Sequence, residues 1–166
     1  PHYLMDPAQS LAAAGQIAAA LIRVDPGGQP YYHQRFTDFG NELRERMVRW
    51  HATLAPHKGR PIVVYHKTWV YFMRRFGLEE FAAVEPKPGI APSLGHVNGL
   101  VQNMRTGKVK VVLAESFRSR RFPDLIGRET GARAVYVPTS VEAEPGVRDY
   151  FTMIDAIVNR LAEGLR

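Results

Sequence analysis

The fold of this protein is set by residues 61–84, which read PIVVYHKTWVYFMRRFGLEEFAAV. The β-branched run Pro61–Tyr65 is typical of a buried strand in a parallel sheet. Residues 67–76 have the composition of a helix, and Gly77 suits the position that ends it. A further apolar run follows at Phe81–Val84. We therefore predict a strand–helix–strand unit over this stretch.

The same alternation continues to the end of the chain. We predict a helix that Ser93 caps and Gly107 ends. After it come a strand, a helix, a strand and a long helix, at Val109–Ala114, Phe122–Thr130, Ala134–Val137 and Gly146–Leu165. The predicted fold class is therefore α/β: a four-stranded parallel sheet with helices on both faces.

Two helices are predicted ahead of the sheet. The first covers residues 8–24, with Asp6 as its N-cap and Pro7 in its first turn. It is apolar almost all round, so we expect it to be buried on more than one side. The second covers residues 29–54 and, at ~1.5 Å per residue, is long enough to cross a small domain.

Composition narrows the function classes. The chain has 166 residues, a formal net charge of +6 and no cysteine. The lack of cysteine excludes disulfides, thiolate zinc sites and iron–sulfur clusters. The basic excess would suit nucleic acid or an anionic membrane surface, but no groove-reading motif accompanies it, so we expect no nucleic-acid partner. Pro1 is not an initiator residue, and we expect the chain to be processed or part of a longer protein.

The carboxyl ends of the strands are where such sheets bind ligands. His66 directly follows the first strand, where a neutral imidazole can act as a metal ligand or a base. A packed, hydrogen-bonded loop histidine explains the same position equally well. The loops after the other strands begin near Glu85, Glu115 and Pro138. His2, considered alone, reads as a terminal histidine.

Several motifs together resemble one family. Pro1-His2 followed by Asp6-Pro7, ahead of an Ala-rich helix, is similar to the Pro-His-x-Trp-Leu-Asp-Pro motif of the solute-binding proteins of bacterial zinc and manganese ABC transporters. The resemblance continues, in order, through Ile62–His66, Tyr71–Leu78, the Pro/Gly-rich loop Pro86–Pro92, Val109–Glu115, Glu129–Ala132 and Tyr150–Leu165. It covers essentially the whole chain.

The resemblance implies two α/β lobes that a long rigid helix joins, with the metal between them. Residues 1–28 would be a remnant of the amino-terminal lobe, residues 29–56 the connector helix, and residues 57–166 the carboxyl-terminal lobe. The implied function is to bind a divalent transition metal and deliver it to an ABC permease, without catalysis. The implied location is the periplasm or the extracytoplasmic membrane surface.

The resemblance also implies the metal ligands. His2 and His66 match two family histidines, and a further histidine belongs to the missing lobe. The fourth position, often Asp, falls in the loop after the last strand, where this chain has no carboxylate before Glu142 and Glu144. The fourth ligand is then one of these, water or a group of the missing lobe. Family members that bind manganese usually have Glu in place of His66, and imidazole suits zinc, so we prefer Zn2+ over Mn2+.

The remaining polar residues are given structural roles. Glu115 is interpreted as an acceptor that positions its neighbours rather than as a ligand. His33 and His51 are interpreted as residues on solvated faces of the second helix. His57 is interpreted as part of a polar turn, and His96 is given a structural role.

Two further interpretations stay open. A small flavodoxin-like enzyme or nucleotide-binding domain would use His66 as a base and hold a phosphate with Arg118, Arg120 and Arg121, although no glycine-rich phosphate motif follows any strand. The apolar first helix also predicts pairing with a second copy, or with the missing lobe, through Leu11, Ile17, Leu21 and Ile22.

Overall fold

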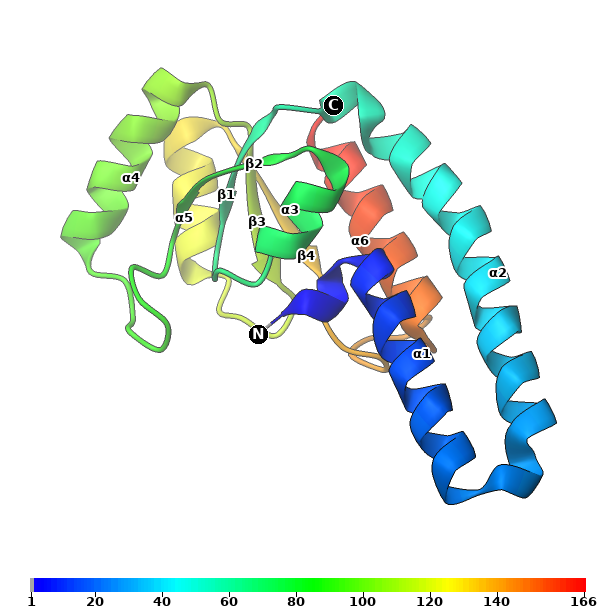
Figure 1. Ribbon diagram of the computed structural model, residues 1–166. Helices are drawn as coiled ribbons and strands as arrows, with labels where there is room; N and C mark the ends of the chain where they lie inside the picture. The colour runs from blue at the N-terminus through cyan, green and yellow to red at the C-terminus, as the bar shows by residue number, and fades with distance from the viewer. Residues whose placement is uncertain (1) are drawn as a thin grey trace.

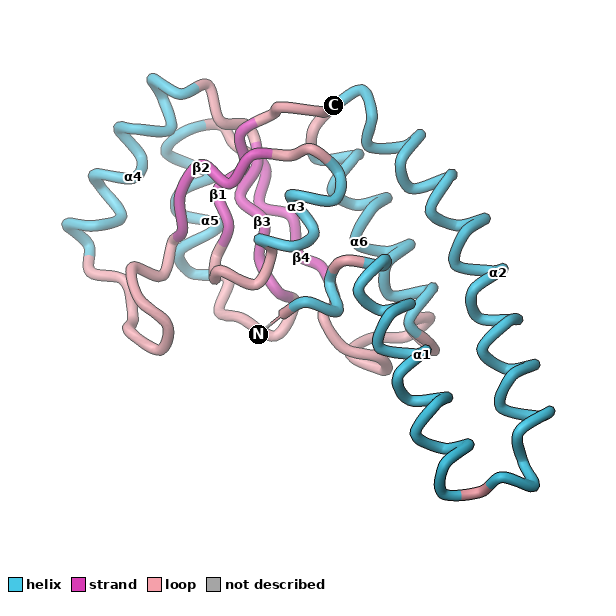
Figure 2. Tube along the Cα trace, in the orientation of Figure 1, coloured by secondary structure: helices cyan, strands magenta, loops and turns pink. Residues whose placement is uncertain are grey.

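The computed structural model describes residues 2–166 and contains one parallel sheet. Its strands are β1 (Pro61–Val64), β2 (Glu79–Ala83), β3 (Val111–Glu115) and β4 (Arg133–Val137), in the spatial order β2-β1-β3-β4. Each neighbouring pair is parallel. Because neighbouring strands are parallel, the carboxyl ends of all four strands lie at the same end of the sheet (Figure 2). The predicted α/β class with a four-stranded parallel sheet is confirmed.

The helices lie on both faces of the sheet, as predicted (Figure 1). They are α1 (Pro7–Val24), α2 (Gln29–Leu54), α3 (Val70–Phe76), α4 (Leu94–Gly107), α5 (Arg121–Thr130) and α6 (Tyr150–Gly164), with short 3-10 turns at Tyr3–Met5, Pro26–Gly28 and Ala55–His57. Helices α4 and α5 cover one face, and α3 and α6 cover the other. Helices α1 and α2 form an antiparallel hairpin that packs on α6 and extends beyond the sheet.

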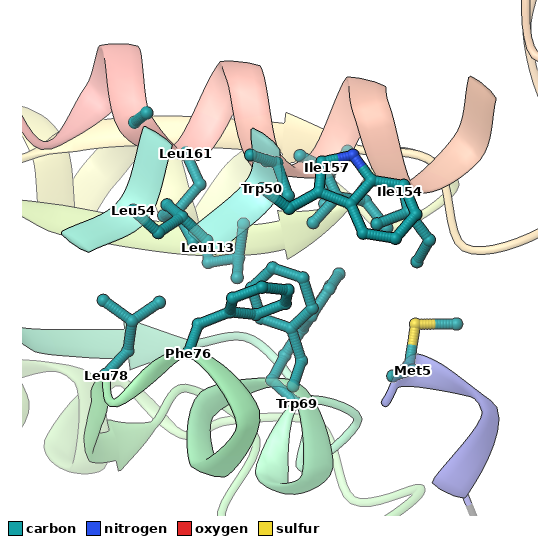
Figure 3. Packing of buried hydrophobic residues seen from close by; sticks show 14 of the residues in the cluster. Met5, Trp50, Leu54, Trp69, Phe76, Leu78, Leu113, Ile154, Ile157 and Leu161 are labelled. Atoms are coloured by element: carbon teal, nitrogen blue, oxygen red, sulfur yellow. The ribbon is translucent and has the colours of Figure 1, made fainter. Parts of the chain in front are cut away.

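The apolar core has one layer on each face of the sheet. Alternate residues of β3 point to opposite layers: Val111 and Leu113 join the layer under α6, whereas Val112 joins the layer under α4 and α5. The α6 layer includes Trp50 and Trp69 among its largest side chains (Figure 3). A strand that is buried on both faces needs a continuous apolar run, which explains why the strands were recognisable in the sequence.

Several helix boundaries differ from the prediction, and three of the differences have a clear structural reason. Helix α3 begins at Val70 rather than at residue 67, because residues 66–69 form a turn at the sheet edge. Helix α6 begins at Tyr150 rather than at Gly146, because the Asp149 carboxylate accepts a hydrogen bond from the Thr152 amide at 2.7 Å and caps the helix there. Gly107 is the last residue of α4, and Lys108 is the residue that leaves the helix, with φ of 53°.

Helix α1 is less covered than the prediction required. It packs mainly on α2, which leaves Ile17 60% exposed and Leu21 42% exposed. Leu11 and Ile22 are half-buried, and Leu11 packs against the core. The expected burial on more than one side is therefore wrong for this chain. Of the helices within residues 2–166, none has both the length and the apolar character that crossing a bilayer requires.

Candidate metal centre

Two histidines lie close together at the carboxyl ends of the strands. His66 follows β1, and His2 comes from the segment before α1; their ring centroids are 5.8 Å apart and the rings are nearly perpendicular, at 87°. Both line a cleft of about 490 Å³ together with Lys67, Tyr71 and Arg74. The structure thus brings together the two residues that the sequence singled out, from segments far apart in the chain.

Asp6 fixes the segment that carries His2. Its carboxylate accepts a hydrogen bond from the Ala8 amide at 2.9 Å and so caps α1, as predicted. The same carboxylate forms a bidentate pair with Arg75 of α3, with N–O distances of 2.7 and 3.0 Å. The Asp6 carboxylate therefore caps α1 and also connects the segment that carries His2 to α3, the helix that follows His66.

Tyr150 anchors the same segment from the other side. Its hydroxyl donates to the Leu4 carbonyl at 2.9 Å and accepts a hydrogen bond from Ser10 Oγ at 2.9 Å. Burial raises the pKa of Tyr150 to about 12, so the hydroxyl stays protonated as a donor. Met5, between Leu4 and Asp6, is buried in the core. These contacts place His2 opposite His66 through the packing of its neighbours.

Glu85 orients His66. It lies just after β2, it is only 6% exposed, and its carboxylate accepts a hydrogen bond from Nδ1 of His66. With Nδ1 engaged, Nε2 is the ring nitrogen that remains for a ligand in the cleft. A carboxylate behind an imidazole is the usual arrangement for a histidine that binds a metal, because it fixes the tautomer and the ring orientation.

Glu115 and Arg118 complete the polar cluster at this edge. Glu115 is 2% exposed and accepts a hydrogen bond from the Thr68 hydroxyl at 2.6 Å, which supports its predicted role as a positioning acceptor. Arg118 lies 3.6 Å from Glu85 and 3.8 Å from Glu115. The sequence reading missed the roles of Glu85 and Arg118. The rule that ligands gather at the carboxyl ends of strands pointed to Glu85, but nothing in the sequence separated Arg118 from its basic neighbours.

The electrostatics favour neutral imidazole at His2. Partial burial is the largest cause that lowers the pKa of His2, and the proximity of His66 lowers it further. A neutral ring is the form that binds a metal. A lowered pKa reduces the proton release that accompanies metal binding, so less free energy is lost to it.

The proposed fourth ligands are not joined to the two histidines. Glu144 pairs with Arg160 of α6 at 2.5 Å, and Glu142 is an exposed loop residue with φ of 61°. Within residues 2–166, no group of three or more His, Asp or Glu side chains is arranged to hold a metal ion. The structure therefore brings His2 and His66 together without a third such group, and their role as metal ligands, like the fourth position, stays a prediction.

The other candidate residues have structural contacts. Arg120 lies over the ring of Tyr136 at 4.5 Å and Arg121 over the ring of Phe122 at 5.3 Å, so with Arg118 on the carboxylates the three do not converge as a phosphate site requires.

Three of the remaining histidines have defined surroundings. His96 Nε2 lies 3.2 Å from the Ala83 carbonyl, and His51 packs on Phe76 with ring centroids 4.9 Å apart. His57 lies in the short turn after α2, as predicted, but it is buried there, and burial lowers its pKa. His96 thus has the structural contact that was predicted, and His51 is exposed as predicted even though its ring packs on Phe76.

Comparison with known families agrees with this geometry. The model of the family described as "ZnuA: Zinc-uptake complex component A periplasmic" matches residues 1–164. The chain belongs to this family. The resemblance read from the sequence is therefore confirmed across nearly all of its length.

Individual relatives are distant and longer. The high-affinity zinc uptake system protein ZnuA of Brucella abortus is 24% identical over 165 residues, which are 99% of this chain and 49% of the relative. The iron-binding protein YfeA of Yersinia pestis is 25% identical over 172 residues, covering 99% of this chain and 54% of the relative. The chain thus spans about half the length of these curated relatives.

Solved structures share the fold. A crystal structure of ZnuA superimposes with a TM-score of 0.86 at 23% identity, over 100% of this chain and 62% of that one. The solute-binding protein FpvC of Pseudomonas aeruginosa in complex with Mn2+ gives a TM-score of 0.84 at 22% identity, over 99% of this chain and 62% of that one. Because these relatives are named for different metals, the metal preference of this chain must be argued from its own residues.

Proposed function

We propose that this chain is the carboxyl-terminal part of a solute-binding protein that carries Zn2+, with Mn2+ as the second choice, to an ABC permease. The observation that carries the proposal is the pair of imidazoles at His2 and His66, 5.8 Å apart in one cleft, with Glu85 behind His66. Imidazole is a better ligand for zinc than for manganese, which favours carboxylate and water. The family name and the zinc-uptake relatives support the same metal.

The ligand set of this chain is incomplete by itself. Zinc takes about four ligands, with nitrogen at ~2.0–2.1 Å. We propose that the rest come from a second lobe, since the relatives are about twice as long as this chain. Residues 1–28 would then belong to the amino-terminal lobe, residues 29–56 would form the connector, and residues 57–166 would be the second lobe.

A ligand set divided between two lobes suits transport. Each lobe alone holds the ion weakly, whereas both together hold it as a chelate, so a small separation of the lobes would release it. The metal is then cargo and undergoes no reaction, and we assign no catalysis. The partner would be a membrane permease and the location extracytoplasmic, as the word periplasmic in the family description supports.

The exposed apolar face of the helical hairpin fits the same proposal. Helices α1 and α2 leave a groove of about 350 Å³ lined by Ile17, Leu21, Tyr31 and Phe36 among others. We propose that the missing lobe covers it in the longer protein and that a second copy covers it when this chain is alone. Sedimentation equilibrium tests the pairing: a monomer at high micromolar concentration would contradict it.

Zinc titration of residues 1–166 tests the metal assignment. We expect weak one-to-one binding by isothermal titration that is lost in His66→Ala and in His2→Ala. His33→Ala is the matched control, because this exposed histidine lies on α2 away from the cleft, and it should leave the affinity unchanged. Zinc binding that survives His66→Ala without change would refute the proposed function.

A further inference from the structure

Two buried carboxylates lie beside the proposed metal site without belonging to the ligand set. Glu85 is 6% exposed and touches His66, and Glu115 is 2% exposed and is held by Thr68. One oxygen of Glu115, Oε2, is buried and has no hydrogen-bond partner among the described residues. Carboxylate oxygens are the ligands that manganese prefers. The carboxyl ends of the strands therefore carry, besides the imidazole of His66, carboxylates of the kind that manganese prefers.

Arg118 is the cation that faces both carboxylates. Its guanidinium nitrogens lie 3.6 Å from Glu85 and 3.8 Å from Glu115. The guanidinium also lies over the rings of Tyr65 and Phe117, at 5.4 and 5.2 Å. Removing one partner from a buried charge pair leaves an uncompensated charge, which is strongly unfavourable. Without Arg118, a divalent cation would be the obvious group to neutralise the two carboxylates.

We propose that Arg118 sets the metal preference of the site. By neutralising Glu85 and Glu115, it keeps Glu85 as the hydrogen-bond partner of His66 and keeps both carboxylates from binding the metal. The site then presents imidazole to the ion and favours zinc over manganese. This inference rests on the proposed function, and it assigns Arg118 as a specificity-determining residue that acts through its neighbours.

The test compares zinc and manganese affinity in Arg118→Met, which keeps an unbranched apolar side chain and removes the charge. We expect the ratio of the Mn2+ dissociation constant to the Zn2+ dissociation constant to fall about 10- to 100-fold, the range over which partners of metal ligands change affinity. Isothermal titration gives the zinc value, and electron paramagnetic resonance of free Mn2+ gives the manganese value. Arg121→Met is the matched control, since this neighbour lies over Phe122 and should leave the ratio unchanged.

A second pair of measurements separates specificity from structural damage. Adding Glu85→Gln to Arg118→Met removes one of the uncompensated carboxylates, so the ratio should return toward the parent value. Optical spectra of bound Co2+ should show more oxygen coordination in Arg118→Met than in the parent.

The results for these variants distinguish failure of the inference about Arg118 from failure of the proposed function. A ratio within twofold of the parent in a folded Arg118→Met protein overturns the inference. If that variant does not fold, Glu85→Gln alone decides. The ratio should then stay within twofold of the parent, because Glu85 does not bind the metal beside Arg118, whereas a rise in the ratio of the Mn2+ to the Zn2+ dissociation constant would overturn the inference. Loss of zinc binding in His66→Ala must hold throughout, and its failure would refute the proposed function instead.

Discussion

Replacing Asp6 by alanine should destabilise the protein and loosen His2 together. The substitution removes the cap on the Ala8 amide and the bidentate pair with Arg75, which is partly buried. Loss of a helix cap costs about 1 kcal/mol, and loss of a partly buried charged hydrogen-bond pair about 1.5 to 3 kcal/mol. The expected total is therefore about 2 to 4 kcal/mol, since both contacts belong to one side chain.

Thermal and urea unfolding measure this loss directly. For a protein of this size about 1 kcal/mol shifts Tm by roughly 2–4 °C, so Asp6→Ala should lower Tm by about 5–15 °C. Asp38→Ala is the control, because Asp38 pairs with Arg35 at 3.7 Å on the exposed face of α2 and should cost less than about 0.5 kcal/mol. Equal losses in the two variants would refute the reasoning that Asp6 links α1 to α3.

Three further outcomes are expected. Burial raises the pKa of Tyr150 from 10.0 to about 12, so the protonated hydroxyl contributes to the free energy of unfolding fully below pH 10, and this contribution is lost as the pH rises toward 12. Urea unfolding midpoints measured against pH should show the loss, and Tyr150→Phe should make it smaller. Gly107→Ala would place a Cβ 2.7 Å from the Phe81 ring and should cost about 1–3 kcal/mol by urea unfolding, whereas Gly99→Ala in the same helix meets open space and should stabilise by about 0.5–1 kcal/mol; the opposite order would contradict the packing. Zinc at about 100 times its dissociation constant should raise the free energy of unfolding of the parent by about 2.7 kcal/mol, which thermal melts measure. The same zinc concentration should leave the stability of His66→Ala unchanged.

The sequence sufficed for those features that depend on local pattern. Helix α2 runs over residues 29–54 as predicted, because Gly28 and Pro30 lie at its start and no proline follows within it. Asp6 and Ser93 act as caps, because a cap needs only the residue and the amides that follow it. Strand β3 was found within two residues at each end, because a central strand buried on both faces needs an unbroken apolar run.

The features that the sequence did not predict depend on contacts between segments that are distant in the chain. The start of α3 at Val70 follows from the turn that binds Thr68 to Glu115, 47 residues later. Glu85 reaches His66 across neighbouring strands, and Arg118 reaches both buried carboxylates from the turn after β3. Arg118, Arg120 and Arg121 look equivalent in sequence, and only the packing of the sheet edge separates their roles. No local pattern carries that information.

The central claim is that His2 and His66, and no other histidines of this chain, bind the metal. Two-dimensional ¹H–¹⁵N correlation spectra of the imidazole rings test it directly, since each of the six histidines gives its own pair of ring-nitrogen signals. In the metal-free chain, His66 should be the Nδ1–H tautomer, held by Glu85. On addition of zinc, the Nε2 signal of His66 and one ring-nitrogen signal of His2 should shift, while His33, His51, His57 and His96 stay unchanged. An unchanged His66, or a shift at any of those four histidines instead, would contradict the account.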